Sequence, residues 1–301
     1  MDTDFKIRTM KTDDGAEIQY IDEGEGQPLL YIYGIGSSIE TQKFFIAAMQ
    51  EHCRMIVFDQ RAFGLTAAAG EMGIHQSARD AGRLIELLGI KDVILFGYSM
   101  GAAVVFSYLE QFGSKLIKKI LIGDMSPKLI NDENWKLGLY QGWYTQEMYE
   151  RDLKLIETDY ERFALILAEQ LLIKRQPEEK RDFSGSAKEI RERILQKRGE
   201  DPVTYVLLKG LVDLPQDHRQ ANFCYWKTMI HADFRPLLGK INVPAGILYA
   251  IPGSGYNPAT AVYMHSQIPD SVLMPMEGCS HMAAGEQPEK WRNYIIKFIN
   301  E

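Results

Sequence analysis

Cysteine is scarce in this sequence, which contains only Cys53, Cys224 and Cys279 among its 301 residues. Three scattered cysteines are too few for a disulfide framework, and their spacing fits no zinc site. A reducing compartment is therefore the simpler expectation. The six histidines contain no H-E-x-x-H or other metal-ligand spacing, so we expect no bound metal ion.

An excess of positive charge and a long hydrophobic run are also lacking. The chain has 34 Lys and Arg against 41 Asp and Glu, a net charge of -7, whereas binding to nucleic acid needs a basic surface. The longest uncharged apolar run, Val93 to Leu109, is interrupted by glycines and is shorter than the roughly 20 residues of a membrane helix. The first residues of the chain show no apolar stretch typical of a secretory signal. We therefore expect a soluble, cytoplasmic protein without a nucleic-acid or membrane partner; the oligomeric state stays open.

What the chain does have is an alternation of short apolar runs and amphipathic stretches. Leu29–Tyr33 and Val93–Phe96 are continuous apolar runs typical of buried strands, and Gln76–Leu88 places its apolar residues on one helical face. This alternation predicts an α/β fold with a mostly parallel sheet, whose functional site lies beyond the carboxyl ends of the strands. We expect strands at 5–10, 18–21, 29–33, 55–58, 93–96, 117–122, 246–249 and 272–276, and helices at 42–50, 76–88, 102–110 and 291–299.

The alternation is interrupted between Pro127 and Asp233, where only helical patterns are found, at 148–155, 163–172 and 188–197. The strand–helix rhythm then resumes. We therefore expect a core formed by residues 1–126 and 234–301 and an inserted helical cap at 127–233, placed over the site. Lysines and arginines in Lys174–Arg198 are mixed with acidic residues, which favours a solvated helical face over a binding tail.

The segment Gly97-Tyr98-Ser99-Met100-Gly101 matches the G-x-S-x-G pattern of a nucleophile elbow. In such an elbow the serine sits on a tight strand-to-helix turn, where larger flanking residues would clash. The turn aims the serine Oγ into the site and places the next backbone N–H at a helix N-terminus. The segment directly follows an expected strand and opens an expected helix, so Ser99 is predicted to be a nucleophile.

At this point the sequence resembles the α/β-hydrolase family. Tyr33-Gly34-Ile35-Gly36 is similar to the family's oxyanion loop, with Tyr33 where the family usually has histidine. Asp59–Thr66 is similar to its D-x-R-G-x-G-x-S segment, and Gly278–His281 to its late catalytic-histidine segment. Together with the elbow, these matches follow the family order over nearly the whole chain. The resemblance implies a mostly parallel central sheet with flanking helices and a helical cap.

The resemblance also implies roles for individual residues. His281 would be the base that activates Ser99, and the backbone N–H groups of Ile35 and Met100 would form the oxyanion hole. Asp59 and Arg61 would brace the loops under the site, and Cys279 would be a small packing residue. Structural roles are expected for the other histidines, His52, His75, His218, His231 and His265.

The acid of the triad is the open question. The family usually supplies an aspartate after strand seven, but that turn, residues 250–257, contains no carboxylate. Asp124, directly after strand six, is the favoured candidate, because some relatives place the acid there; the alternative is an ordinary capping aspartate. Glu277 and Asp270 are weaker candidates. If Asp124 pointed away from His281, Ser254 or Asn257 would be next.

Aromatic residues of the expected cap suggest an apolar substrate. The predicted function is that of a carboxylesterase, which cleaves an ester of a small apolar carboxylic acid through an acyl-enzyme, without a cofactor or metal. Two alternatives are a cofactor-free oxygenase or peroxidase of this fold and a weakly hydrolytic ligand-binding receptor. The serine argues against the dehalogenase and epoxide-hydrolase branches, which use aspartate at the elbow. The candidate pocket residues are Tyr33, Tyr98, Trp135, Trp143 and Trp226.

Overall fold

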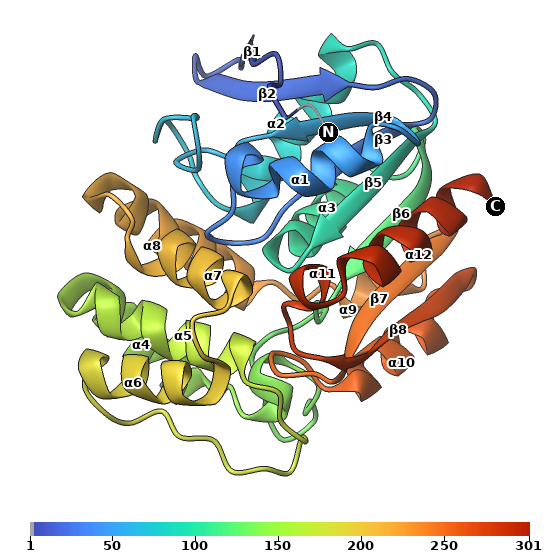
Figure 1. The fold of residues 1–301 in the computed structure, drawn as a ribbon. Helices are drawn as coiled ribbons and strands as arrows, with labels where there is room; N and C mark the ends of the chain where they lie inside the picture. The colour runs from blue at the N-terminus through green and yellow to red at the C-terminus, as the bar shows by residue number, and fades with distance from the viewer. Residues whose placement is uncertain (1–2) are drawn as a thin grey trace.

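A twisted sheet of eight strands forms the centre of the molecule (Figure 1). The computed structural model describes residues 3–301, except for the side chains of residues 216 and 217. The strand order is β1-β2-β4-β3-β5-β6-β7-β8; β1–β2 and β2–β4 pair antiparallel and the other neighbours pair parallel. The strands are β1 (Arg8–Lys11), β2 (Glu17–Glu23), β3 (Pro28–Ile32), β4 (Arg54–Phe58), β5 (Val93–Tyr98), β6 (Ile117–Gly123), β7 (Ala245–Pro252) and β8 (Ser271–Cys279).

Helices cover both faces of the sheet, which is why β5 is buried along its whole length. Phe96 and Tyr98 point to one face, where both rings contact Trp291. Gly97 lies between them in the strand and faces α3, because an added Cβ would lie 2.5 Å from Ala102. The helices of the core are α1 (Ile39–Met49), α2 (Ile74–Leu87), α3 (Met100–Phe112), α9 (Arg235–Leu238), α10 (Pro258–Gln267), α11 (Ala283–Glu286) and α12 (Pro288–Asn300).

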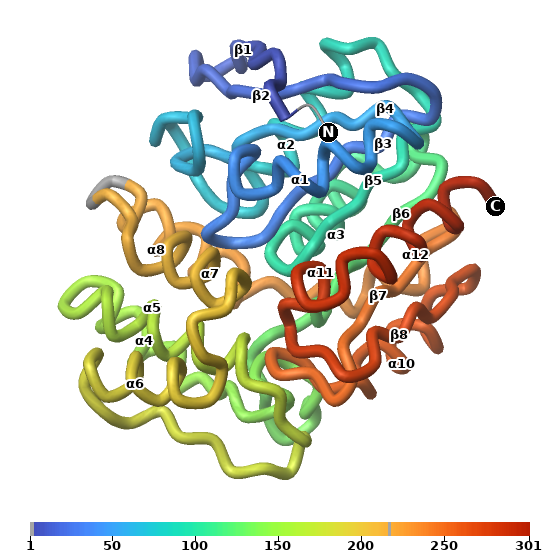
Figure 2. Tube along the Cα trace, in the orientation of Figure 1, coloured from blue at the N-terminus to red at the C-terminus, as the bar shows by residue number. Residues whose placement is uncertain are grey.

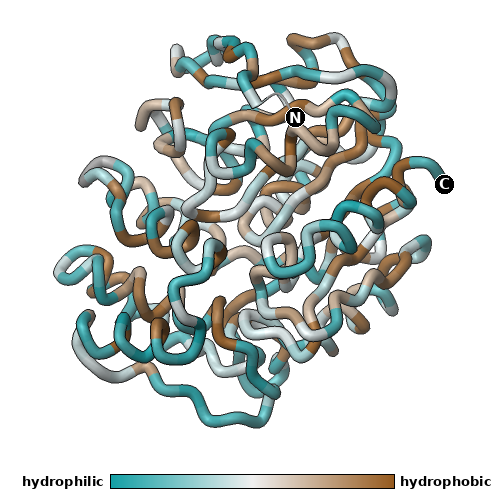
Figure 3. Tube along the Cα trace, viewed as in Figure 1, coloured by the Kyte–Doolittle hydropathy of each residue, from teal (hydrophilic) through white to brown (hydrophobic). Residues whose placement is uncertain are grey.

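The two ends of the chain contribute neighbouring helices. Figure 2 shows α1 and α12 beside each other, although one follows β3 and the other closes the chain. Phe45 of α1 contacts Tyr31 and Phe96 of the sheet, and Trp291 of α12 contacts Phe96 as well. The two helices therefore share one apolar layer. Figure 3 shows hydrophobic residues along the central strands and hydrophilic ones on the outer segments.

The described residues between β6 and β7 contribute no strand to this sheet. A backbone bridge joins Lys128 to Asp233, so the two ends of this stretch lie together. Its helices gather below the sheet in the view of Figure 1. They are η1 (Leu139–Gly142), α4 (Gln146–Thr158), α5 (Tyr160–Leu172), α6 (Ala187–Arg198), α7 (Pro202–Val212) and α8 (Gln216–His231).

Several observed elements begin or end a few residues from the expected bounds, and α10 was not among the expected helices. The first strand begins at Arg8 instead of Phe5. Residues 173–186 contain no helix, and Arg175 and Arg181 within them are buried, at 8% and 4% exposure. The expectation of a solvated helical face for Lys174–Arg198 is therefore wrong for its first half, because these two side chains turn inward from a loop; α6 is the helical part.

Candidate active site

The turn between β5 and α3 holds Ser99 in a conformation that few residues adopt. Its φ is 54° and its ψ is -125°, outside the favoured regions for a residue with a side chain. An added Cβ at Gly101 would lie 1.8 Å from the Ile32 carbonyl oxygen, and one at Gly97 would lie 2.3 Å from the Gly101 carbonyl oxygen. The two glycines thus let α3 pack directly on β3 and β5, and the turn projects a partly exposed Ser99.

His281 connects this serine to a carboxylate. It follows β8, and its Nε2 lies 2.9 Å from Ser99 Oγ. Its Nδ1 lies 2.6 Å from Asp124 Oδ2. Imidazole and carboxylate are both almost fully buried, with side-chain exposures of 3% and 3%. The structure therefore brings together the three side chains predicted to form a triad, in the order Ser99, His281, Asp124.

Asp124 is held between two strands. It follows β6, and its backbone N–H donates to the Leu248 carbonyl of β7. Its φ of 41° lies in the left-handed region, so the backbone turns sharply here. Oδ1 accepts a hydrogen bond from the Ala250 N–H at 3.3 Å, which leaves Oδ2 for His281. Each carboxylate oxygen therefore has a different donor.

Two further residues fix the loop that carries His281. The His281 N–H donates to Ser254 Oγ at 2.7 Å, and the Tyr98 hydroxyl donates to the His281 carbonyl. Burial raises the pKa of Tyr98 well above its usual value, so the hydroxyl keeps the proton it donates. The Tyr98 ring also stacks on the imidazole, with centroids 5.4 Å apart and planes inclined by 15°. Backbone and ring of His281 are thus both restrained.

None of the alternative partners considered for the His281 imidazole has a recorded contact with its ring. Ser254 contacts the backbone of His281 and donates to the Leu171 carbonyl, and so it does not orient the imidazole. Asn257 caps α10 through the Ala259 N–H. Glu277 and Asp270 are exposed.

The backbone around Ser99 offers two free donors. Met100 is the first residue of α3, and the N–H groups of a helix's first turn have no acceptor inside the helix. Among the described residues, neither Met100 N–H nor Ile35 N–H donates a hydrogen bond. An added Cβ on Gly34 would lie 2.9 Å from Ser99 Cβ, so this loop runs directly beside the serine. Two unpaired backbone donors beside the serine are what an oxyanion hole requires.

Tyr33 braces the loop after β4. Its hydroxyl donates to Asp59 Oδ1 at 2.7 Å, and its carbonyl accepts from Gln60 Nε2 at 3.0 Å. Asp59 also accepts from the N–H groups of Ile39 and Leu65. Burial raises the pKa of the Asp59 carboxyl, and these donors partly offset that effect.

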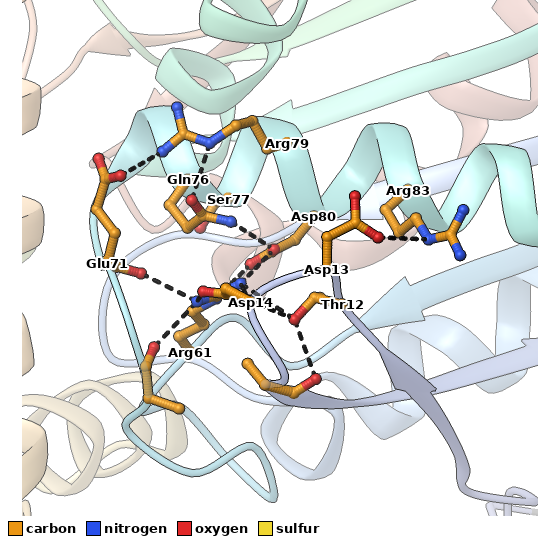
Figure 4. Close-up of polar contacts among 12 residues, drawn as sticks. Thr12, Asp13, Asp14, Arg61, Glu71, Gln76, Ser77, Arg79, Asp80 and Arg83 are labelled. Atoms are coloured by element: carbon orange, nitrogen blue, oxygen red, sulfur yellow. Dashed lines mark hydrogen bonds and ion pairs between the residues drawn. The ribbon is translucent and has the colours of Figure 1, made fainter.

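Arg61 lies next to this loop in a second buried network (Figure 4). Its guanidinium, 0% exposed, contacts Asp80 at 2.9 Å and Asp14 at 2.5 Å. The hydrogen bond from Arg61 holds the pKa of Asp14 below its usual value. The network ties the N-terminal hairpin to α2, which is the bracing role expected for Arg61.

The five aromatic pocket candidates differ in burial and in the residues that they contact. Tyr33 is fully buried, and its hydroxyl donates to Asp59. Trp226 is also buried, and its Nε1 donates to the Tyr144 hydroxyl. Trp135 packs on Tyr263 and Arg235. Trp143 is 37% exposed. Tyr98 alone of the five candidates lines the apolar groove described below.

A buried arginine of the α5–α6 loop supports the site and was not foreseen from the sequence. Arg181 donates to Gln170 Oε1, to Gln141 Oε1 and to the Ser254 carbonyl, the last at 2.7 Å. Burial, with repulsion from a second arginine, lowers the pKa of Arg181 to about 10. Arg181 thus holds Ser254, whose Oγ accepts the hydrogen bond from the His281 N–H. Nothing local in the sequence distinguishes it from its exposed neighbours.

Comparison with known proteins defines the family. A sequence profile described as alpha/beta hydrolase fold matches residues 27–189. The chain belongs to the α/β-hydrolase family. A non-heme haloperoxidase from Rhodococcus erythropolis is 30% identical over 158 residues, which are 52% of this chain and 56% of that protein. The chain spans about half the length of the curated relatives it matches.

Solved structures of this family share the fold. An esterase from Exiguobacterium antarcticum has a TM-score of 0.78 at 20% identity, over 97% of this α/β hydrolase and 99% of that chain. A bromoperoxidase from Bacillus anthracis has a TM-score of 0.77 at 20% identity, over 98% of this chain and 100% of that chain.

Within residues 3–301, leaving aside the side chains of residues 216 and 217, no group of His, Cys, Asp or Glu residues could hold a metal ion. None of the helices described is long and apolar enough to cross a membrane.

Proposed function

We propose that this α/β hydrolase is a serine hydrolase that cleaves a carboxylic ester of a small apolar substrate. The observation that carries the proposal is the hydrogen-bonded chain from Asp124 through His281 to Ser99, with contacts of 2.6 Å and 2.9 Å. A serine hydroxyl is a weak nucleophile unless a base is positioned to remove its proton. His281 has that position, and the free N–H groups nearby suit a developing oxyanion.

The reaction proceeds in two halves. Ser99 Oγ attacks the ester carbonyl carbon while His281 Nε2 takes its proton, and the Asp124 carboxylate stabilises the imidazolium that forms. The Ile35 and Met100 N–H groups hold the oxyanion. Collapse breaks the bond to the alcohol, which receives the proton from His281. Water, deprotonated by His281, then attacks the acyl-enzyme and releases the acid and Ser99. No cofactor takes part.

Residues 127–233 act as a cap in this proposal. Gly210 of α7 meets Gly36 of the oxyanion loop so closely that an added Cβ on Gly210 would lie 2.2 Å from the Gly36 carbonyl oxygen. Backbone contact of this kind leaves no room for a side chain, so α7 packs directly on the oxyanion loop. A dry site strengthens the electrostatic interactions on which acyl transfer depends.

A second candidate function is favoured by the haloperoxidase relatives. In it, hydrogen peroxide replaces water as the acceptor of the acyl group, so the product is a peracid. The same three side chains serve both reactions, since only the second nucleophile differs. A receptor that binds a ligand with negligible turnover is the remaining alternative.

An ester series with a serine control tests the proposal. The p-nitrophenyl esters of increasing acyl length are assayed with the unmodified enzyme, with Ser99→Ala and with the matched control Ser266→Ala, whose serine is exposed on α10. We expect Ser99→Ala to lose several decades of rate, because nucleophile and base act as a unit, and Ser266→Ala to lose none. A fluorophosphonate should label Ser99.

The outcomes separate the candidates. Normal ester turnover by Ser99→Ala contradicts the serine-hydrolase proposal. Halide oxidation that needs peroxide and a carboxylic acid, in the absence of measurable ester hydrolysis, favours the second candidate. Saturable binding of an ester with no burst of p-nitrophenol favours the receptor.

A further inference from the structure

An apolar groove lies beside the site and has no part in the reaction above. It has a volume of about 450 Å³, and it is bounded by α1, α7, α11 and α12, which meet on one side of the sheet (Figure 1). Pockets of roughly 300–1,000 Å³ hold small organic ligands. The walls are mainly apolar and include Phe45, Ala48, Val203, Leu207, Ala284 and Trp291.

The floor of the groove adjoins the triad. Tyr98 precedes Ser99, and Met282 follows His281; both line the groove. The Tyr98 ring contacts Trp291 on one side, at 5.3 Å, and His281 on the other, at 5.4 Å. Ser99 and His281 themselves are not among the lining residues, and the Tyr98 ring contacts both His281 and Trp291, which borders the groove.

One charged side chain lies in this lining. Arg292 of α12 borders the groove and is partly buried. Among the described residues, none forms a hydrogen bond or an ion pair with the Arg292 guanidinium. By contrast, Arg61, Arg181 and Arg193 all have partners. A partly buried guanidinium without a partner attracts an anion, and its planar donors match a carboxylate.

We propose that the groove binds a free aliphatic monocarboxylate, with the carboxylate on Arg292 and the chain against the apolar walls. The single cationic group in the lining favours one negative charge over the two of a phosphate monoester. The polar side chains of α1 in the lining, such as Gln42, whose Oε1 accepts a hydrogen bond from the Tyr31 hydroxyl, are neutral and add no charge to the groove. The proposal goes beyond ester hydrolysis and does not require Ser99 to be a nucleophile.

Calorimetric titration with decanoate, below its micelle concentration, tests the proposal. We expect one decanoate per chain, with binding that persists in Ser99→Ala. Decanol and decylammonium, which keep the chain and change the head group, should bind at least about tenfold more weakly, because a charged hydrogen bond is lost. Butyrate should also bind more weakly, because less apolar surface is buried.

Matched variants locate the site. Arg292→Gln should weaken decanoate binding about tenfold or more, whereas Lys297→Gln removes an exposed charge from the same helix and should leave it unchanged. Val206→Glu places a negative charge in the groove lining and should abolish decanoate binding. Val206 is 41% exposed, so the fold should tolerate the substitution. Tyr205→Glu, at the neighbouring position 63% exposed and outside the lining, is its control.

Three results overturn the proposal. Equal affinity for decanol and decanoate, or an unchanged affinity in Arg292→Gln, excludes recognition of the carboxylate. Unchanged decanoate binding in Val206→Glu, combined with strictly competitive inhibition of p-nitrophenyl acetate hydrolysis, places the ligand at Ser99 instead. Because binding is measured in Ser99→Ala as well, failure of the esterase proposal leaves this test valid.

Discussion

Replacing Asp124 by asparagine tests the contact between the carboxylate after β6 and His281. The carboxylate accepts two hydrogen bonds, from Ala250 N–H at 3.3 Å and from His281 Nδ1 at 2.6 Å. Asparagine has the same shape but only one acceptor oxygen. If that oxygen stays on Ala250, the amide NH2 group faces Nδ1, which must then be unprotonated. The imidazole proton moves to Nε2, where it prevents His281 from accepting the proton of Ser99.

The expected loss is large because two effects act together. The variant favours the wrong tautomer of His281 and removes the buried anion that stabilises the imidazolium. In a well-studied serine protease the same change lowers kcat about 10⁴-fold. At about 1.36 kcal/mol per decade this corresponds to about 5 kcal/mol of transition-state stabilisation. We expect a comparable fall in kcat here, with KM changed little, since the buried Asp124 carboxylate bonds to Ala250 N–H and to His281 Nδ1, on the side of the imidazole away from Ser99.

The assay is steady-state hydrolysis of p-nitrophenyl acetate, with kcat and KM determined separately. Asp270→Asn is the matched control, because it makes the same chemical change at an exposed residue. Thermal unfolding of both variants shows whether the fold persists. The loss in Asp124→Asn should not be recovered by raising the substrate concentration.

An Asp124→Asn enzyme with normal kcat would refute the role assigned to this carboxylate. A loss that appears only in KM would also refute it, because orientation of the base acts on the transition state. In either case another group would have to stabilise the imidazolium.

Three further predictions concern the framework of the site. Gly101→Ala should abolish activity and lower the yield of folded protein, since the new Cβ would lie 1.8 Å from a β3 carbonyl oxygen; normal thermal unfolding and turnover would contradict this. Arg61→Met leaves Asp80, 1% exposed, as an unpaired buried charge and should lower the free energy of unfolding by about 3–5 kcal/mol in urea titrations, with partial recovery in the double variant Arg61→Met/Asp80→Asn. Arg181→Gln should cost about 1–3 kcal/mol of stability, and the exposed neighbour Lys180→Gln less than about 0.5 kcal/mol; equal effects would show that burial of Arg181 is unimportant.

The order of strands and helices could be predicted because its signals are local. Buried strands are continuous apolar runs, and β5 is one from Val93 onward. The ends of edge strands are harder to predict, because exposed and buried residues are mixed in them; β1, which begins at Arg8, is an example. The loop at 173–186 was misjudged for a related reason. Its charge pattern is typical of a solvated helix, and only the packing of α5 and the turn after β7 against Arg181 makes it buried.

By itself the sequence determined the fold class, the position of the elbow and the identity of the serine and histidine predicted to act together. The elbow depends on residues close in the chain, since glycines on both sides of Ser99 are needed where a strand turns so tightly into a helix. His281, 182 positions away, was identified by the resemblance of Gly278–His281 to the family's late histidine segment. Asp124 was already favoured from the sequence, but its contact with His281 depends on the tertiary structure, because 157 positions separate the two residues and the parallel pairing of β6, β7 and β8 brings them together. The same holds for the groove beside Tyr98, whose walls come from both ends of the chain. Distances between such residues are set by strand order and helix packing, which no short segment contains.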